Sequence, residues 1–334
     1  MKDTFYVALT GCGAISAIHL AALAAMPEVK IVALCDVKKE KAEAARDTYA
    51  PSARVFTDTE EMLDACPDLY ALHVTLPHYL HVPAAVSALK RNINVFLEKP
   101  VGISEEDIAR LTEAERNSRG KLCVCFQNRF NETTKVMDAL AEQYGEPLGC
   151  RAFVNWARSA PYYTESGWRG FYRTEGGGVM INQAIHTLDL LLRYLGKPVS
   201  LSATCANHHL KDVIEVEDSC EATLWFASGA VGNFYATTSF CQDMPVFLEI
   251  VFKDHIVSLF NGQVFDNGSP VAKENVRHET TGKACWGQGH SLLIGLFYEA
   301  LEKGLPMPVT LDSAALSLRV LLSAFRSKGN IVTL

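Results

Sequence analysis

A regular alternation of strand-like and helix-like segments over the first third of the chain constrains the fold more than any other feature. Short apolar runs at residues 5–9, 29–34 and 69–75 alternate with segments of helical spacing, such as residues 18–25 and 38–49. Strands that alternate with helices of about ten to fifteen residues indicate βαβ units and a parallel sheet. The sequence therefore predicts an α/β fold whose N-terminal part is built on a parallel sheet.

Local signals mark the ends of several helices. Asp58 with Glu61, and Ser104 with Asp107, have the spacing of an N-cap residue and its capping partner. Asn92 is expected in the left-handed conformation that ends a helix.

The chain becomes strand-rich beyond residues 125–150. Short turns at Ser228-Gly229 and Lys253-Asp254 join successive strands, which indicates an antiparallel sheet. The extended segments are expected at residues 151–158, 201–206, 219–227, 230–240, 247–252 and 255–260.

Three helical segments accompany these strands, at residues 181–195, 291–303 and 313–327. We therefore predict two domains, comprising residues 1–124 and residues 125–334.

Charge and composition narrow the function classes. The chain has 334 residues, with 31 Lys and Arg against 38 Asp and Glu, and a formal net charge of −7. Nucleic acids and anionic membranes bind clustered Lys and Arg, and no basic stripe is visible, so neither partner is expected. No apolar run approaches the roughly 18 residues of a membrane span, and the N-terminus runs straight into a strand rather than forming a signal peptide.

The ten cysteines are scattered singly through apolar stretches. Disulfides need a secretory route, so we expect reduced, buried thiols and a cytoplasmic protein. No metal site is expected, because the sequence has no H-E-x-x-H and no paired C-x-x-C motif. The adjacent His208 and His209 would face opposite sides of a strand.

A glycine turn follows the first predicted strand and opens a helix, with the sequence Gly11-Cys12-Gly13-Ala14-Ile15-Ser16. Gly11 allows the tight turn, and Gly13 lets the backbone approach a pyrophosphate at the helix N-terminus. A strand–helix turn without a ligand is the alternative. His19, farther along this helix, is expected to pack rather than to bind.

Asp36 ends the second predicted strand about 20 residues beyond the turn, where a carboxylate binds the hydroxyls of the adenosine ribose. A carboxylate there repels a 2′-phosphate, so NAD is favoured over NADP. Lys38 and Lys39 soften that preference.

Three further motifs complete the pattern of a known family. Residues 75–81 follow one strand, Glu98-Lys99-Pro100 follows the next, and the segment 176–189 leads from three glycines into the 181–195 helix. With the glycine turn, these motifs resemble the Gfo/Idh/MocA oxidoreductases, and the resemblance covers nearly the whole chain. It implies a Rossmann domain followed by an α/β domain with a large, mainly antiparallel, open-faced sheet. It also implies an active site between the domains, at the carboxyl ends of the parallel strands.

The resemblance assigns roles to individual residues. Lys99 is the family's catalytic lysine, and His186 is its catalytic histidine. The expected NAD-binding residues are Gly11, Cys12, Gly13, Ala14, Ile15, Asp36, Thr75, Pro77, His78, His81, Glu98, Lys99 and Arg169. The expected substrate-binding residues are Lys99, Asn128, Tyr163, Trp168, Asn182 and His186.

The chemistry explains why these residue types are needed. Oxidation of a secondary alcohol removes a hydride, which nicotinamide accepts, and a proton, which requires a base. Imidazole titrates near neutral pH, so His186 is expected to be the base and Lys99 the group that orients and polarises the oxygen. The reverse assignment is the alternative. A cis Lys99–Pro100 bond would place the ammonium rigidly, but the sequence leaves this open.

Several positions depart from the family's pattern or stay ambiguous. Asn182 stands where many relatives have Asp; an amide carries no charge, so a substrate hydroxyl is its expected partner rather than an Asp–His relay. His78 either reaches the ligands or is an exposed loop residue. Asp189 either packs or orients a neighbouring group, and His290 is a further candidate for the cleft.

These motifs predict an NAD(H)-dependent oxidoreductase that moves a hydride between nicotinamide and a secondary ring hydroxyl of a sugar, glycoside or cyclitol. One alternative is a glycosidase or glycoside 3-oxidase that oxidises the ring transiently and recycles NAD. Another is a non-catalytic regulator that senses sugar or NAD, against which the presence of Lys99 and His186 argues. An open sheet face is usually covered by another subunit, so a homodimer or homotetramer through the C-terminal sheet is expected.

Overall fold

The computed structural model describes residues 4–273 and 288–334, which divide into two compact units. The first unit contains residues 4–127 and 289–314, and the second contains the other described residues. The chain leaves the first unit close to the predicted domain boundary at residues 124 and 125. It returns there with helix α10 (Gly289–Lys303), which packs against α1 (Ser16–Ala24) and strand β6 (Leu122–Cys125). The boundary itself stays a prediction.

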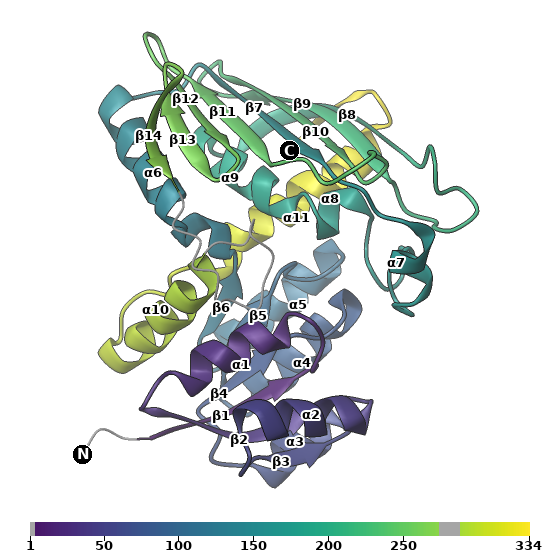
Figure 1. Ribbon diagram of the computed structural model, residues 1–334, viewed down its shortest axis with the longest axis vertical. Helices are drawn as coiled ribbons and strands as arrows, with labels where there is room; N and C mark the ends of the chain where they lie inside the picture. Colours follow the sequence, from purple (N-terminus) through teal and green to yellow (C-terminus); the bar gives the residue numbers. More distant parts are fainter. Residues whose placement is uncertain (1–3, 274–287) are drawn as a thin grey trace. The chain divides into compact units, whose positions relative to one another are not determined.

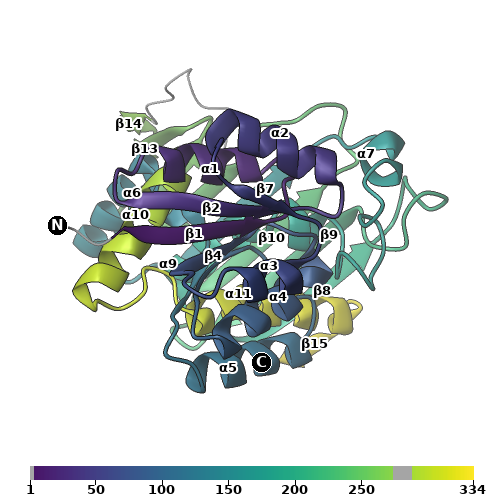
Figure 2. The same ribbon diagram turned by 90° about the horizontal axis from the view of Figure 1, so that it is seen from below.

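The first unit is built on a six-stranded parallel sheet with the order β3-β2-β1-β4-β5-β6, which confirms the predicted parallel sheet. Helices α1 and α2 lie on one side of β1 and β2, and α4 and α5 lie on the other side (Figure 2). Because both faces are covered, the strands read as continuous apolar runs. The remaining elements are β1 (Phe5–Thr10), β2 (Val29–Cys35), α2 (Lys39–Tyr49), β3 (Arg54–Phe56), α3 (Thr59–Ala65), β4 (Ala71–Val74), α4 (His78–Lys90), β5 (Asn94–Glu98) and α5 (Glu105–Arg116).

Three predicted helix boundaries are confirmed. The carboxylate of Asp58 accepts a hydrogen bond from the backbone N–H of Glu61 at 2.9 Å. The hydroxyl of Ser104 accepts one from the N–H of Asp107 at 3.1 Å. Asn92 follows α4 with a φ of 58°. The first two side chains thus bond backbone N–H groups that have no partner within the first turn of a helix. Asn92 ends its helix through its left-handed backbone conformation.

The second unit contains a nine-stranded sheet with the order β14-β13-β12-β11-β7-β10-β9-β8-β15. Strands β7 and β10 are parallel, and every other neighbouring pair is antiparallel. Helices α6 and α9 pack on one face of this sheet (Figure 1). Its strands are β7 (Gly149–Asn155), β8 (Pro198–Ala206), β9 (Ser219–Phe226), β10 (Val231–Thr237), β11 (Phe247–Val251), β12 (Ile256–Phe260), β13 (Gln263–Asp266), β14 (Ser269–Lys273) and β15 (Ile331–Thr333).

The other helices of this unit lie before β8 and near the end of the chain. They are η1 (Gln127–Phe130), α6 (Glu132–Tyr144), α7 (Ala160–Thr164), α8 (Val179–Asn182), α9 (Ile185–Leu195) and α11 (Leu311–Ser327), with Gln127 and the first turn of α11 in the first unit.

The single helix predicted at residues 181–195 is wrong in one respect, because the structure divides it into α8 and α9. The backbone N–H groups of Gln183 and Ala184 both donate to the carbonyl of Val179, at 3.1 and 2.8 Å. Because one carbonyl accepts two hydrogen bonds, the regular helical pattern is interrupted here. Asn182 lies at the end of α8, before the interruption, and His186 lies near the start of α9, after it.

The expectation that every cysteine is reduced is also wrong. Cys205 and Cys220 form a disulfide, and they stand directly opposite one another in the antiparallel pair β8 and β9. Facing positions of such a pair bring side chains of one sheet face together. The spacing of cysteines along the sequence does not reveal this pair, because the pairing depends on the register of strands β8 and β9.

Candidate active site

The carboxyl edge of the parallel sheet carries the predicted cofactor residues of the first unit. Gly11 follows β1, Asp36 follows β2, Thr75 follows β4, and Lys99 follows β5. Parallel strands end at the same edge, so these four residues lie along one side of the unit, where α/β sheets bind their ligands.

The Asp36 carboxylate fixes the glycine turn. One of its oxygens accepts a hydrogen bond from the backbone N–H of Cys12, and the other accepts one from the N–H of Lys38, both at 2.8 Å. Burial, with the nearby Asp36 charge, raises the pKa of the Cys12 thiol to about 12. Cys12 therefore contributes its backbone N–H rather than a thiolate.

Two glycines shape this turn in different ways. Gly11 has a φ of +94°, and a Cβ there would lie 2.5 Å from the carbonyl oxygen of Thr75. A Cβ on Gly13 would meet no atom within 4 Å, so the space above it is open. Ala14 and Ile15 complete the turn, with Ile15 as the N-cap of α1. This is the geometry that a pyrophosphate-binding turn requires.

Thr75 and His81 join the turn to its neighbours. The Thr75 hydroxyl lies 2.7 Å from the Gly11 carbonyl oxygen and 3.0 Å from that of Thr10. The His81 ring lies between the carbonyl oxygens of Leu76 and Pro100, each 2.8 Å from a ring nitrogen. Burial lowers the pKa of His81, although both carbonyl contacts oppose that shift. His81 therefore connects the loops after β4 and β5.

Pro77 and His78 begin helix α4. Pro77 is its N-cap and His78 is its first residue. The alternative of an exposed loop histidine is wrong, because His78 is only 4% exposed and its ring packs 5.7 Å from that of His81. Contact between His78 and a ligand stays a prediction.

The Glu98-Lys99-Pro100 motif ends β5. The Lys99–Pro100 peptide bond is cis, and Lys99 is partly exposed. Its backbone N–H donates to the Glu98 carboxylate at 3.2 Å. Glu98 is buried, and its other oxygen lies 2.9 Å from Nε2 of His19. His19 is thus buried, as expected, but it is hydrogen-bonded rather than merely packed.

In the second unit, the Glu217 carboxylate fixes the glycine-rich turn before α8. It accepts hydrogen bonds from the backbone N–H groups of Gly178 at 2.9 Å and Met180 at 3.0 Å. A Cβ on Gly178 would collide with the carbonyl oxygen of Glu217, so glycine is required there. Burial raises the pKa of Glu217 to about 7, although the two N–H groups oppose that shift.

A second buried carboxylate, Glu175, holds Asn182. The Asn182 amide donates to one oxygen of Glu175 at 2.6 Å, and the backbone N–H of Gly170 donates to the other at 2.6 Å. An aspartate at this position would set two carboxylates against each other, so Glu175 explains why this chain has Asn. The sequence analysis missed Glu175 and Glu217, because no local motif marks a residue that accepts backbone N–H groups.

An aromatic and cationic cluster lies beside Asn182. The Arg169 guanidinium stands 4.5 Å from the ring centre of Tyr162 and 4.8 Å from that of Trp168. The Tyr162 hydroxyl accepts from Gln183 Nε2 at 3.0 Å. Tyr163 is buried and its hydroxyl lies 3.2 Å from that of Thr238. Tyr162 is therefore better placed than Tyr163 for substrate contact.

Other predicted residues have internal partners. Asp189 is 2% exposed and accepts two hydrogen bonds from Arg129, at 2.6 and 2.7 Å, and one from Ser317. Asp189 is thus packed in the interior and also orients a neighbouring arginine, so both of the roles expected for it apply. His290 belongs to the first unit, where Nε2 lies 3.7 Å from the Glu98 carboxylate. Burial lowers its pKa to about 4.

Two predicted ligand-binding residues carry buried polar atoms that lack a hydrogen-bond partner within residues 4–273 and 288–334. These atoms are Oδ1 of Asn128 and Nε of Arg169. Such an atom costs free energy unless a ligand or water satisfies it. Both atoms fit a polar ligand, and His186, at the second position of α9, is partly exposed.

Comparison with known proteins decides the family. A model described as "Oxidoreductase family, NAD-binding Rossmann fold" matches residues 5–126, and the "GFO/IDH/MocA C-terminal domain" matches residues 135–257. The chain belongs to the Gfo/Idh/MocA oxidoreductase family. The predicted family, fold class and NAD-binding Rossmann domain are thereby confirmed.

The individual relatives share less than a third of their residues with this chain over the aligned regions. An inositol 2-dehydrogenase of Salmonella paratyphi B is 30% identical over 43% of this chain and 44% of its own length. The D-glucoside 3-dehydrogenase of Escherichia coli K12 is 29% identical over 64% and 60%. The chain thus aligns with less than two thirds of either. The WlbA dehydrogenase of Bordetella pertussis, solved with NADH and UDP-GlcNAcA, has a TM-score of 0.88 at 26% identity, over 100% of this chain and 99% of its own.

The residues at the sheet edge fit NAD. The open space above Gly13 admits a pyrophosphate, and the N-terminus of α1 supplies N–H groups there. Asp36 follows strand β2, and its contact with the ribose hydroxyls, which would disfavour a 2′-phosphate, stays a prediction. Within the described helices, none is long and apolar enough to cross a membrane.

The Asn182–Glu175 contact can be tested by exchanging the amide and the carboxylate between the two positions. Asn182→Asp should lower the free energy of unfolding by about 2 kcal/mol at neutral pH, because it opposes two buried carboxylates. When Glu175→Gln is added to Asn182→Asp, the introduced amide can donate to the introduced carboxylate while its oxygen accepts from Gly170. Urea denaturation should therefore find the double variant more stable than Asn182→Asp. A double variant that loses as much as the two single losses combined would contradict this contact.

Glu217 generates a test by pH. Its pKa is about 7 in the folded protein against 4.5 as the reference value. A carboxyl whose pKa rises on folding stabilises the protein below its unfolded pKa, and that contribution is lost as the pH passes the folded pKa. Glu217→Gln cannot ionise. Its free energy of unfolding relative to the wild type should therefore rise by about 3 kcal/mol between about pH 4.5 and pH 8.

The comparison with the wild type at each pH removes the contributions of other groups, including His290, whose lowered pKa acts in the opposite direction. A difference that does not change with pH would show that Glu217 is ionised in the folded protein throughout this range, as it is in the unfolded chain, and would contradict the raised pKa.

Proposed function

We propose that this protein is an NAD-dependent dehydrogenase that oxidises a secondary ring hydroxyl of a sugar, glycoside or cyclitol. The observation that carries the proposal is the position of Lys99. It follows β5 at the same sheet edge as the glycine turn and Asp36, and its backbone is held by the buried Glu98. A cationic side chain beside a nicotinamide site suits the stabilisation of an alkoxide.

NAD, when bound, supplies the acceptor for the hydride. Lys99 donates a hydrogen bond to the reacting hydroxyl and stabilises the negative charge that develops on its oxygen. His186 takes up the hydroxyl proton, since an imidazole changes charge near neutral pH. Glu217 holds the turn that begins α8, the helix that carries Asn182, and Glu175 accepts a hydrogen bond from the Asn182 amide.

A neutral or weakly charged ring is the substrate class that these residues favour. The carboxylates of Asp189 and Asp243 engage Arg129 and Arg158, whereas Arg169 stacks between Tyr162 and Trp168. Aromatic rings suit the apolar C–H face of a sugar or cyclitol. The names of the inositol 2-dehydrogenase and the D-glucoside 3-dehydrogenase support a ring hydroxyl as the reacting group.

A substrate panel tests this proposal. The purified protein is mixed with NAD and with sugars, cyclitols and alkyl glycosides in turn, and absorbance at about 340 nm follows NADH. We expect a steady rise with at least one member. Substrate consumption without net NADH, in protein that keeps its cofactor through purification, would instead identify the internally recycled reaction. A regulator would bind a panel member and turn over none.

The two catalytic assignments make a sharper prediction. Lys99→Ala and His186→Ala should each reduce kcat by about 100-fold or more, because each removes a group that acts on the reacting oxygen. NADH binding, followed by its fluorescence, should survive in His186→Ala. Lys121→Ala and His209→Ala change exposed residues and serve as matched controls. Near-normal turnover in His186→Ala would show that another group is the base.

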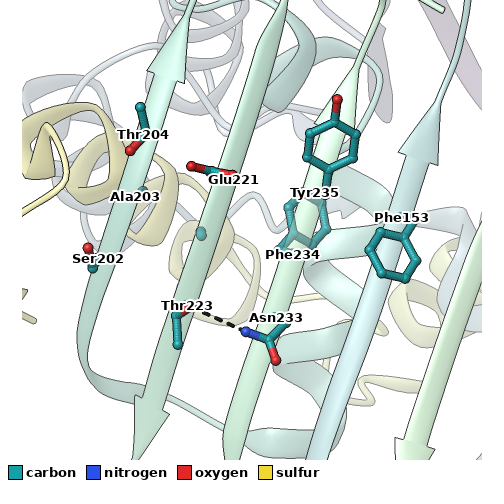
Figure 3. Close-up of a pocket in the computed structure, with 10 residues that line it drawn as sticks. Phe153, Ser202, Ala203, Thr204, Glu221, Thr223, Asn233, Phe234 and Tyr235 are labelled. Atoms are coloured by element: carbon teal, nitrogen blue, oxygen red, sulfur yellow. Dashed lines mark hydrogen bonds between the residues drawn. The ribbon is translucent and has the colours of Figure 1, made fainter.

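We further propose that two copies of the chain associate through the open face of the nine-stranded sheet. Phe153 stacks on Phe247 at 5.7 Å between ring centres, and Tyr235 and Phe260 on this face are 37% and 41% exposed. Figure 3 shows part of the face, where Tyr235 and Phe153 stand above the sheet and Asn233 contacts Thr223. An exposed sheet face that carries these aromatic side chains suits a second copy of itself.

Light scattering tests this association. The wild type should have twice or four times the mass of one chain, and Phe260→Glu should shift it toward the monomer because a charge cannot be buried at the centre of an apolar interface. Tyr6→Glu, at an exposed aromatic residue of β1, is the control. A monomeric wild type at micromolar concentration would exclude the association.

We also propose a cytoplasmic location. Cysteines that form no disulfide, among them the buried Cys12, Cys35 and Cys150, support a reducing compartment. The Cys205–Cys220 bond is the observation that opposes it.

A further inference from the structure

A row of four buried polar side chains crosses the interior of the first unit behind Lys99. Glu98 ends β5, His19 lies on α1, His73 lies on β4, and Tyr298 lies on α10. His19 Nε2 is 2.9 Å from Glu98, the Nδ1 atoms of His19 and His73 are 3.1 Å apart, and His73 Nε2 is 2.9 Å from the Tyr298 hydroxyl. All four residues are buried, and the proposed reaction does not use this row.

Hydrogen-bond donors and acceptors in this row follow a single direction when both histidines are neutral. The Tyr298 hydroxyl donates to His73 Nε2, His73 Nδ1–H donates to His19 Nδ1, and His19 Nε2–H donates to the Glu98 carboxylate. Each ring then has one N–H and one acceptor nitrogen, as a neutral imidazole must. The arrangement thus requires the Nδ1–H tautomer of His73 and the Nε2–H tautomer of His19.

One added proton reverses the direction of the hydrogen bond between Tyr298 and His73. The Tyr298 proton passes to His73 Nε2, the His73 Nδ1 proton passes to His19 Nδ1, and the entering proton restores the tyrosine hydroxyl. His19 is then an imidazolium paired with Glu98, and His73 donates to the Tyr298 oxygen. The row has gained one proton, and the net charge behind Lys99 has changed from −1 to zero.

The surroundings favour the unprotonated row at neutral pH. Burial lowers the pKa of His73 well below its usual value. Burial alone would raise the pKa of Glu98, but the hydrogen bond from His19 and the electrostatic effects of His19, His290 and Lys99 outweigh it, so Glu98 is ionised. Among the described residues, the other titratable groups that interact with the row are Lys99, His81, Cys125, His290 and Tyr70.

We propose that Glu98, His19, His73 and Tyr298 form a one-proton store that positions Lys99 and controls its charge, and thereby sets the acid limit of the reaction. The ionised Glu98 accepts the Lys99 backbone N–H and attracts its ammonium. When the row takes up a proton, this attraction is neutralised. The inference rests on the proposed dehydrogenase function, and these four residues are positioning residues rather than catalytic ones.

The same side chains could instead be read as metal ligands, since ligand atoms of His19, Glu98 and Cys125 lie within 4.8 Å of one another. Two observations favour a proton. The 2.9 Å separation of His19 and Glu98 is that of a hydrogen bond. Burial and the Glu98 charge raise the pKa of the Cys125 thiol well above its usual value, so it does not supply a thiolate.

The first measurement needs no substrate. Long-range ¹H–¹⁵N NMR of the histidine rings in the intact chain reports the tautomer and charge of each ring. At about pH 8 we expect His73 as the Nδ1–H tautomer and His19 as the Nε2–H tautomer. On acidification both should change at one shared midpoint. Separate midpoints, the opposite tautomers, or one equivalent of zinc by mass spectrometry would overturn the proposal.

The second measurement uses His73→Phe, which keeps a ring stacked on Phe96 but cannot donate a proton to His19 Nδ1. In this variant His19 should lose the shared midpoint, and the acid limb of the kcat profile should move down by about one pH unit. Tyr70→Phe, which changes a phenol outside the row, should leave both unchanged. A lower kcat with an unshifted profile would show a purely structural role. Loss of all turnover on the substrate panel with normal NMR results would contradict the proposed function and leave the proton store standing.

Discussion

Carboxylates that accept backbone N–H groups hold four segments of the candidate site in shape. Asp36 fixes the glycine turn through Cys12 and Lys38, and Glu217 fixes the second glycine-rich turn through Gly178 and Met180. Glu175 and Glu98 do the same for Gly170 and Lys99. A charged acceptor strengthens such bonds about twofold over a neutral one, so these loops are set before any ligand binds.

This arrangement places the two proposed catalytic residues on rigid supports. Gly11 and Gly178 are required because a Cβ would meet neighbouring backbone. Lys99 and His186 each extend from a strand or helix end rather than from a long loop. Preorganised groups of this kind lower a barrier because they need little rearrangement as charge develops on the reacting oxygen. The cost is the burial of several carboxylates, and the raised pKa of Glu217 is one consequence.

Local patterns predicted much of this structure, and long-range contacts account for what they missed. The glycine turn, the caps at Asp58 and Ser104 and the parallel sheet depend on residues close in sequence, so a single chain reveals them. Glu217 lies far along the chain from the turn that it holds, and the Cys205–Cys220 pair depends on strand register. The break between α8 and α9 needed Val179 to accept two hydrogen bonds, which no hydrophobic period shows. Comparisons with known proteins established the family and its NAD-binding domain.

In the reaction that we propose, this chain moves a hydride from a ring carbon of the substrate to nicotinamide. The most direct measurement uses a substrate identified by turnover, labelled with deuterium at the carbon that becomes the carbonyl, and mass spectrometry of the cofactor afterwards. The account predicts one deuterium on the nicotinamide ring for each molecule of ketone formed. Ketone formation with an unlabelled cofactor, or turnover that persists after all NAD has been removed, would contradict it.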